Sequence, residues 1–134
     1  MSTLKVNNIQ TAGGGSNSTP EEIEGGRAKI WASVNGTGTP SFNDSFNCTS
    51  VVDENTGDYT INFSITMANA NYSIVGMSEN WEGTNTDSFT AISERKGHRA
   101  VGSVRFRCLR LRFDQQPPQF QDSERMGIAI FGDV

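Results

Sequence analysis

The chain has 134 residues, a length that favours one domain, and a formal net charge of −4. No apolar run approaches the roughly 18 residues of a membrane span, and the N-terminus lacks the basic and apolar regions of a secretory signal. The acidic balance argues against a dedicated nucleic-acid binder. We therefore expect no membrane insertion and no nucleic-acid partner.

The apolar residue types favour strands over helices. Leu occurs 3 times, against 9 Ile, 8 Val and 8 Phe, and Ser, Thr, Asn and Gly together make 52 residues. Branched and aromatic side chains suit strands, whereas small polar residues and glycine suit turns. The composition predicts an all-β protein.

Residues 1–26 differ from the rest of the chain and are expected to form an extended N-terminal arm. The stretch 3–10 is strand-like and leads into a loose Gly/Ser-rich segment. Thr19, Pro20 and Glu22 then predict one short helical turn with a capping box. The arm has no core of its own, so it must lie against its own domain, a sister chain or another protein.

Five apolar residues are candidates for oligomerisation or attachment. Four of them lie in the arm, and the fifth is Trp31. The pattern from 27 to 34 alternates with period two and places the Trp31 side chain on the polar face of its strand. The other reading of Trp31 is a single exposed side chain that needs no explanation. The candidate contact residues are Leu4, Val6, Ile9, Ile23 and Trp31.

Residues 27–134 are expected to form one β domain. Its first strand turns Ala28, Ile30, Ala32 and Val34 inward, and residues 35–40 form a turn.

The next strand, 45–53, is expected to face inward through Phe46, Cys48 and Val52. Alternation over 59–65 predicts its antiparallel partner.

A further strand, 71–78, carries Val75 and Met77 opposite Tyr72 and Ile74. Val75, Met77 and the apolar stretch 126–131 fit burial between subunits, or alternatively a central strand of one sandwich.

The C-terminal half alternates strands with polar loops. A strand over 88–95 is followed by a turn at 96–99, and the parity change within 101–113 predicts a bulge or a bend near 108–109. The prolines in 115–121 predict a loop. The strand 126–131 is apolar throughout, so it is expected to be covered on both faces. Seven to eight short strands predict an antiparallel β-sandwich or jelly roll.

Enzyme, metal and cofactor chemistry are not expected. The single histidine, His98, has no supporting catalytic motif, and the two cysteines lie too far apart for a clustered zinc site. Cys48 and Cys108 both alternate with apolar residues, which predicts buried free thiols. A disulfide between them is the alternative.

Basic residues cluster in one part of the chain. Seven of eleven lie within eighteen positions, which fits either attraction to acidic host-surface glycans or a solvated strand face paired with acids. Trp81, in the loop 79–87, fits stacking on a sugar or packing of the loop on the domain. The candidate ligand-binding residues are Trp81, Arg95, Lys96 and Arg99.

The order of several segments resembles small virion structural and tail-fibre-type proteins of tailed phages that infect marine cyanobacteria and related hosts. The similarity covers about residues 2–75. The segments that carry it are 2–10 (STLKVNNIQ), 18–23 (STPEEI), 27–31 (RAKIW), 36–39 (GTGT), 44–47 (DSFN), 56–63 (TGDYTINF) and 69–72 (NANY).

The resemblance implies a virion protein that forms a homo-oligomer, most simply a trimer, and contacts other virion proteins. It supplies no catalytic residues. We expect a fibre-type or tip domain that attaches through its arm and contacts host-surface polysaccharide. The alternative is a ligand-free structural protein, such as a capsid decoration, a capsid fibre or a tail-attachment protein. A glycan-degrading enzyme is the remote alternative.

Overall fold

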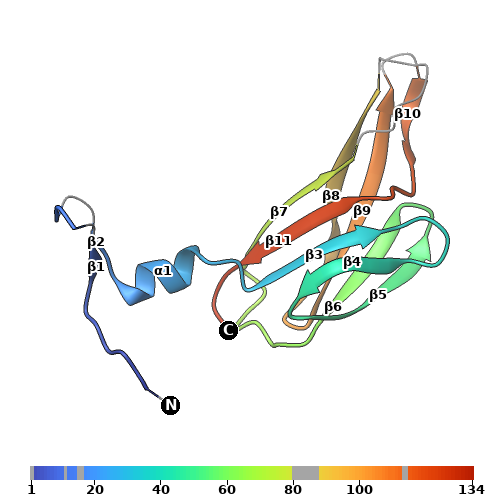
Figure 1. Ribbon diagram of the computed structural model, residues 1–134. Coiled ribbons are helices and arrows are strands. Elements are labelled where there is room, and N and C mark those ends of the chain that lie inside the picture. Colours follow the sequence, from blue (N-terminus) through green and yellow to red (C-terminus); the bar gives the residue numbers. More distant parts are fainter. Residues whose placement is uncertain (1, 11, 15–16, 80–87, 113–114) are drawn as a thin grey trace.

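The computed structural model describes residues 2–10, 12–14, 17–79, 88–112 and 115–134 (Figure 1). The protein is mostly β, with antiparallel sheets and one short helix. Its elements in chain order are β1 (Ile9–Gln10), β2 (Asn17–Ser18), α1 (Pro20–Gly26), β3 (Ile30–Asn35), β4 (Ser41–Phe46), β5 (Cys48–Asn55), β6 (Asp58–Phe63), β7 (Ser73–Ser78), β8 (Ser88–Ala100), β9 (Ser103–Arg112), β10 (Gln115–Phe120) and β11 (Met126–Phe131).

Two sheets make up the domain. The first, called here the β3 sheet, has the order β4-β3-β11-β7. The second, the β9 sheet, has the order β10-β9-β6-β5, with β8 on the other edge of β9. Side chains from both sheets meet in a single core, to which β3, β6, β9 and β11 contribute most.

Period-two alternation places the core residues as predicted in β3 and β6. Ile30, Ala32 and Val34 are buried, and so are Tyr59 and Ile61. The expected antiparallel hairpin is also present, since β5 pairs with β6. In these strands the inward face follows directly from the spacing of apolar residues.

The strand expected over 45–53 is in fact two strands in different sheets. The chain changes sheet at Asn47, whose φ of 57° turns the backbone between β4 and β5. Asn47 Nδ2 donates to the Lys29 carbonyl at 2.7 Å and holds this corner. Phe46 therefore lies on the outer face of the β3 sheet and is exposed, not inward as predicted.

A register shift in β5 explains the second wrong assignment in this region. The shift lies between Cys48 and Ser50 and reverses the parity of the residues that follow. Cys48 and Val51 consequently pack against the core, whereas Val52 is exposed. The prediction that Val52 faces inward is wrong for this reason.

The predicted turn at 96–99 is absent, because β8 continues to Ala100. Glu94 pairs with Phe106 and Arg99 with Val104, so residues 95–98 bulge out opposite Arg105 alone. The chain reverses afterwards, at 101–102.

Of the bulge or bend predicted near 108–109 of the next strand, the bulge is absent from the β8–β9 pairing, because β9 keeps one register with β8 from Phe106 to Arg112. What changes along β9 is its other neighbour, from β6 to β10.

The two C-terminal strands correct two further expectations. The stretch 115–121 was expected as a loop, but β10 pairs with β9 and bulges between Gln115 and Gln119, where the prolines need no ladder hydrogen bond. The core face of β11 is buried through Met126, Ile128 and Ile130. The described residues of the chain do not cover its other face, where Gly127 is exposed and Ala129 is partly exposed.

The arm extends away from the two-sheet domain (Figure 1). It contains the small β1–β2 pair and α1. Thr19 caps α1 as predicted: its side chain accepts from Glu22 N, and the Glu22 side chain accepts from Thr19 N.

Candidate functional site

The four predicted ligand-binding residues do not form one site. Trp81 lies outside the described residues. Lys96 is exposed at the bulge of β8, while Arg95 and Arg99 bind acidic groups of the same chain. Both arginines thus form the ion pairs with acids that the alternative interpretation expected, and their binding of a ligand stays a prediction.

Arg99 closes the side of the domain where β7 and β8 approach each other. Its Nε donates to Glu94 Oε1 at 2.7 Å and its second terminal nitrogen binds Glu94 Oε2, so the pair is bidentate. Another nitrogen donates to the Tyr72 carbonyl at 2.6 Å. The hydrogen bond with Arg99 lowers the pKa of Glu94. Arg99 is therefore occupied in joining the two ends of the bulge.

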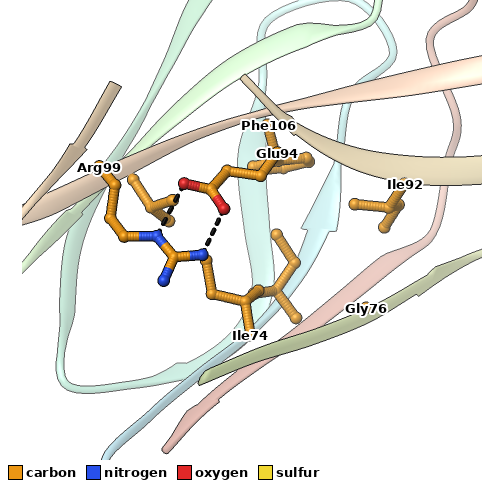
Figure 2. A pocket seen from close by; sticks show the side chains of 8 residues that line it. Ile74, Gly76, Ile92, Glu94, Arg99 and Phe106 are labelled. Atoms are coloured by element: carbon orange, nitrogen blue, oxygen red, sulfur yellow. Dashed lines mark hydrogen bonds and ion pairs between the residues drawn. The ribbon is translucent and has the colours of Figure 1, made fainter. Parts of the chain in front are cut away.

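Figure 2 shows this pair at a small cavity between the two sheets, with the Arg99 guanidinium pointing toward the Glu94 carboxylate. The cavity has a volume of about 130 Å³ and is otherwise lined mainly by apolar side chains, among them Ile74, Ile92 and Phe106. Its two charged side chains, Glu94 and Arg99, already bind each other. We therefore interpret the cavity as part of the fold and not as a binding site.

Arg95 belongs to a second and larger cluster, centred on Asp58. The carboxylate accepts from Arg95 at 2.6 Å, from Arg105 at 2.6 and 3.0 Å, and from Arg107 at 3.1 Å. Arg105 also contacts Glu54 Oε2 at 3.2 Å. The group spans the start of β6, the β8 bulge and the middle of β9.

Asp58 is only 4% exposed, although it lies on the outer face of its sheet. Burial raises the pKa of this carboxyl, but hydrogen bonds and charge from Arg105 and Arg107 outweigh that effect and lower it to about 2. Asp58 is consequently ionised at neutral pH.

A hollow of about 410 Å³ opens beside the Asp58 cluster. Phe120 of β10 lies in its wall, with the Arg107 guanidinium 4.8 Å above the ring centre. Asn55, at the end of β5, and Thr56, in the β5–β6 turn, complete the wall.

The hollow beside Asp58 was missed from the sequence because its parts come from four separate segments. The alternation of β6 and β9 could have placed Asp58 and Arg107 outward, but not beside Phe120.

Trp31 lies in an apolar row that crosses all four strands of the β3 sheet. In register, Phe46 pairs with Trp31, Trp31 with Ala129, and Ala129 with Val75. Val75 is 53% exposed, and Met77 beside it is 80% exposed. A shallow hollow of about 490 Å³ runs over this row. The structure thus brings Trp31 together with the residues predicted to lie between subunits.

The four arm residues predicted to make contacts are all exposed. They range from Val6, at 39%, to Leu4, at 86%, and lie on the part of the chain that projects from the domain. Neither Ile9 nor Ile23 packs against the core. The described residues show an apolar arm and an apolar sheet face, and none of these residues covers either surface.

The remaining chemistry of the described residues is sparse. Cys48 and Cys108 are free thiols, and burial raises the pKa of both. Among the described residues, no group of three or more His, Cys, Asp or Glu side chains is placed to hold a metal ion. No helix in the described part of the chain is long and apolar enough to cross a membrane.

Comparisons with known proteins give no relative. No family model, curated protein or solved structure matches the chain at a significant level. The functional argument accordingly depends on the residues themselves.

Proposed function

We propose that the protein is a structural protein of a tailed-phage particle, a fibre- or tip-type domain that assembles and attaches through its N-terminal arm and contacts the host surface. The observation that carries this proposal is the pair of uncovered apolar surfaces, one on the arm and one on the β3 sheet. The resemblance over residues 2–75 supplies the class of particle.

The arm projects from the domain, so its exposed apolar residues need another molecule to cover them. Lys29, at the start of the domain, is only 4% exposed and donates from Nζ to the Glu24 carbonyl at 2.6 Å. This contact fixes the C-terminal end of α1 where the helix leaves the domain (Figure 1). Strand β1, which includes Ile9, lies beyond the helix and away from the two-sheet domain (Figure 1).

The proposed occupant of the apolar row on the β3 sheet is the arm of a second copy of this chain. Apolar surface on both sides is removed from water when they meet, at roughly 25 cal/mol for each Å² buried. A contact from an arm to a different surface of the next copy is heterologous, and heterologous contacts form closed rings when the rotation permits. A trimer is the ring we propose.

The proposal treats the two-sheet domain as a β-sandwich that holds its loops rigidly, as in many attachment proteins. The finer assignment to a jelly roll remains a prediction. The ligand-free alternative, a capsid decoration, capsid fibre or tail-attachment protein, is favoured by Arg99, because all three of its guanidinium nitrogens bind Glu94 or the Tyr72 carbonyl of its own chain.

Two measurements test the proposal. Light scattering on the full chain should give a mass near three times 14.6 kDa, about 44 kDa, and deletion of residues 1–18 should reduce the mass to that of a monomer while the domain stays folded. Antibody labelling of particles of the phage that encodes the chain should mark the tip of a fibre. Labelling over the capsid would favour the ligand-free alternative, and a full chain that is monomeric and absent from particles would refute both.

A further inference from the structure

The hollow beside Asp58 has a surplus of positive charge. Three guanidinium groups, those of Arg95, Arg105 and Arg107, face two carboxylates, those of Asp58 and Glu54. Because three positive charges meet two negative ones, the cluster carries one net positive charge in a chain whose total is −4. The hydrogen bonds that hold the pKa of Asp58 near 2 keep this count valid at neutral pH.

The arginines also have donors that Asp58 does not use. A guanidinium carries five N–H donors. Arg107 donates to Asp58 only through Nε, at 3.1 Å, and Arg95 only through one terminal nitrogen, at 2.6 Å. Asp58 accepts four hydrogen bonds, three at Oδ2 and one at Oδ1, and the Oδ1 bond comes from Arg105. Within the part of the chain that the structure describes, Arg107 donates to a carboxylate through Nε alone, which leaves its two terminal nitrogens for an oxyanion. Arginine binds oxyanions with paired, charge-assisted hydrogen bonds.

The rest of the wall suits a hydroxylated ring. Phe120 is 45% exposed, so much of its side chain is open to a ligand while Arg107 lies over the ring. Asn55 uses its Oδ1 to accept from Thr56 N at 2.9 Å, which leaves its amide N–H groups as donors. An aromatic ring, an amide and a hydroxyl beside arginines match the apolar face, the hydroxyls and the acidic group of a sugar acid.

We propose that this hollow binds one acidic sugar residue, with the carboxylate or sulfate held by the terminal nitrogens of Arg107 and Arg95. The sugar ring packs on Phe120, and its hydroxyls bond to Asn55 and Thr56. The volume of about 410 Å³ lies within the range of small-molecule sites. A single acidic residue fits better than an extended polyanion, which the net charge of −4 repels.

The site goes beyond arm-mediated assembly. Its interpretation as a contact to host glycans rests on the proposed function, but its existence does not. A binding measurement on the purified chain therefore separates the two: failure to bind overturns the site alone, and failure of particle labelling overturns the phage role alone.

The test is calorimetric titration of the full chain with D-glucuronate, glucose 6-sulfate, inorganic sulfate and glucose. We expect the two acidic sugars to bind with dissociation constants in the millimolar range or tighter, and glucose to bind at least tenfold more weakly. The acidic sugar that binds more tightly shows whether the site prefers a carboxylate or a sulfate. Sulfate alone should bind more weakly than glucose 6-sulfate, because it lacks the ring that Phe120 contacts.

Matched variants locate the site. Arg107→Gln should weaken binding of the acidic sugars at least tenfold, and Phe120→Ala should weaken sugar binding while leaving inorganic sulfate within twofold. Arg125→Gln removes the same charge from an exposed position and should change binding less than twofold. Circular dichroism shows whether each variant is folded. If Arg107→Gln does not fold, Phe120→Ala locates the site on its own. Equal effects of the Arg107 and Arg125 variants, or no binding of either acidic sugar, would overturn the proposal.

Discussion

Lys29 and Glu24 connect the arm to the domain through a contact in which the lysine is buried and the carboxylate is half exposed. Lys29 Nζ binds both the backbone carbonyl and the side-chain carboxylate of Glu24, and the hydrogen bond from Lys29 lowers the pKa of that carboxyl. Arg27 reaches the same carboxylate at 2.9 Å, but from an exposed position. The direction of the arm thus depends on one lysine and not on the surface ion pair.

Replacement of Lys29 should release the arm. Lys29→Met removes both contacts to Glu24, so we expect faster amide hydrogen exchange in α1 and easier proteolysis before residue 27, with the domain still folded. Arg27→Met is the control, since an exposed ion pair contributes little, and it should leave exchange in α1 nearly unchanged. Equal exchange rates in the two variants would contradict the assigned role of Lys29.

A charge in the apolar row of the β3 sheet should impair assembly. Val75→Asp places a carboxylate on the proposed contact with the neighbouring arm, and light scattering should then report a lower mass. Val52→Asp introduces the same change on an exposed strand position of the other sheet and should leave the mass unchanged. Both substitutions are on the surface, so the melting temperature of the domain should shift little. If the two variants assemble equally, the β3 sheet is not the contact face.

Gly57→Ala should strongly destabilise the domain. Gly57 has a φ of 61°, and an added Cβ would lie 2.6 Å from Gln121 N and 2.7 Å from the Cys108 carbonyl oxygen, both backbone atoms. We expect a loss of about 3 kcal/mol or more in the free energy of unfolding, measured with urea.

Gly97→Ala is the matched control for Gly57→Ala. Its φ of 81° is also positive, but nothing lies within 4 Å of the added carbon. Only the backbone cost of about 1–2 kcal/mol then remains. A similar loss in both variants would show that the close approach at Gly57 is not what requires glycine.

Asp58 should make the domain sensitive to acid. Its pKa of about 2 in the folded protein lies below its ordinary value of 3.8. A carboxyl whose pKa falls on folding stabilises the fold above the unfolded pKa, and this contribution disappears as the pH falls through the folded value. The difference corresponds to roughly 2 kcal/mol, lost between about pH 4 and pH 2. Urea unfolding across this range measures it.

Two asparagine variants assign this acid sensitivity. Asp58→Asn should flatten the dependence of unfolding free energy on pH in that range. Asp53→Asn neutralises an exposed carboxylate nearby and should retain most of the slope. An unchanged slope in Asp58→Asn would assign the acid sensitivity to other groups.

Both thiols should be found free. Titration with a thiol reagent after unfolding, without reductant, should count two. In the folded protein both should react slowly near pH 8, because burial raises the pKa of Cys48 to about 11 and also that of Cys108. A count of zero after unfolding would indicate a disulfide, in conflict with the structure.

Local patterns in the sequence determined which face of several strands enters the core. Ile30, Ala32 and Val34 alternate with polar residues, and period two is a geometric property of an isolated strand. The capping box at Thr19 and Glu22 is equally local, because its two partners are three residues apart. Such features need no knowledge of which strands are neighbours.

The tertiary structure decided the features that depend on strand pairing. Asn47 moves the chain from one sheet to the other, and the shift after Cys48 reverses the face of Val52. A shift of one residue reverses every later side chain, yet it leaves the sequence pattern of the strand unchanged. Register is set by contacts with the partner strand, and a single strand's sequence does not contain it.

The candidate site shows the same division. The positions of the basic residues in the sequence revealed the cluster of arginines. Only the fold determined that Arg99 pairs with Glu94 and that Arg95 reaches Asp58, 37 positions earlier in the chain. The bulge of β8 and the pairing of β10 with β9 bring Arg95 and Phe120 to one hollow. Charge and burial act through distances in space, so the partner of each arginine was fixed only when distant strands came together.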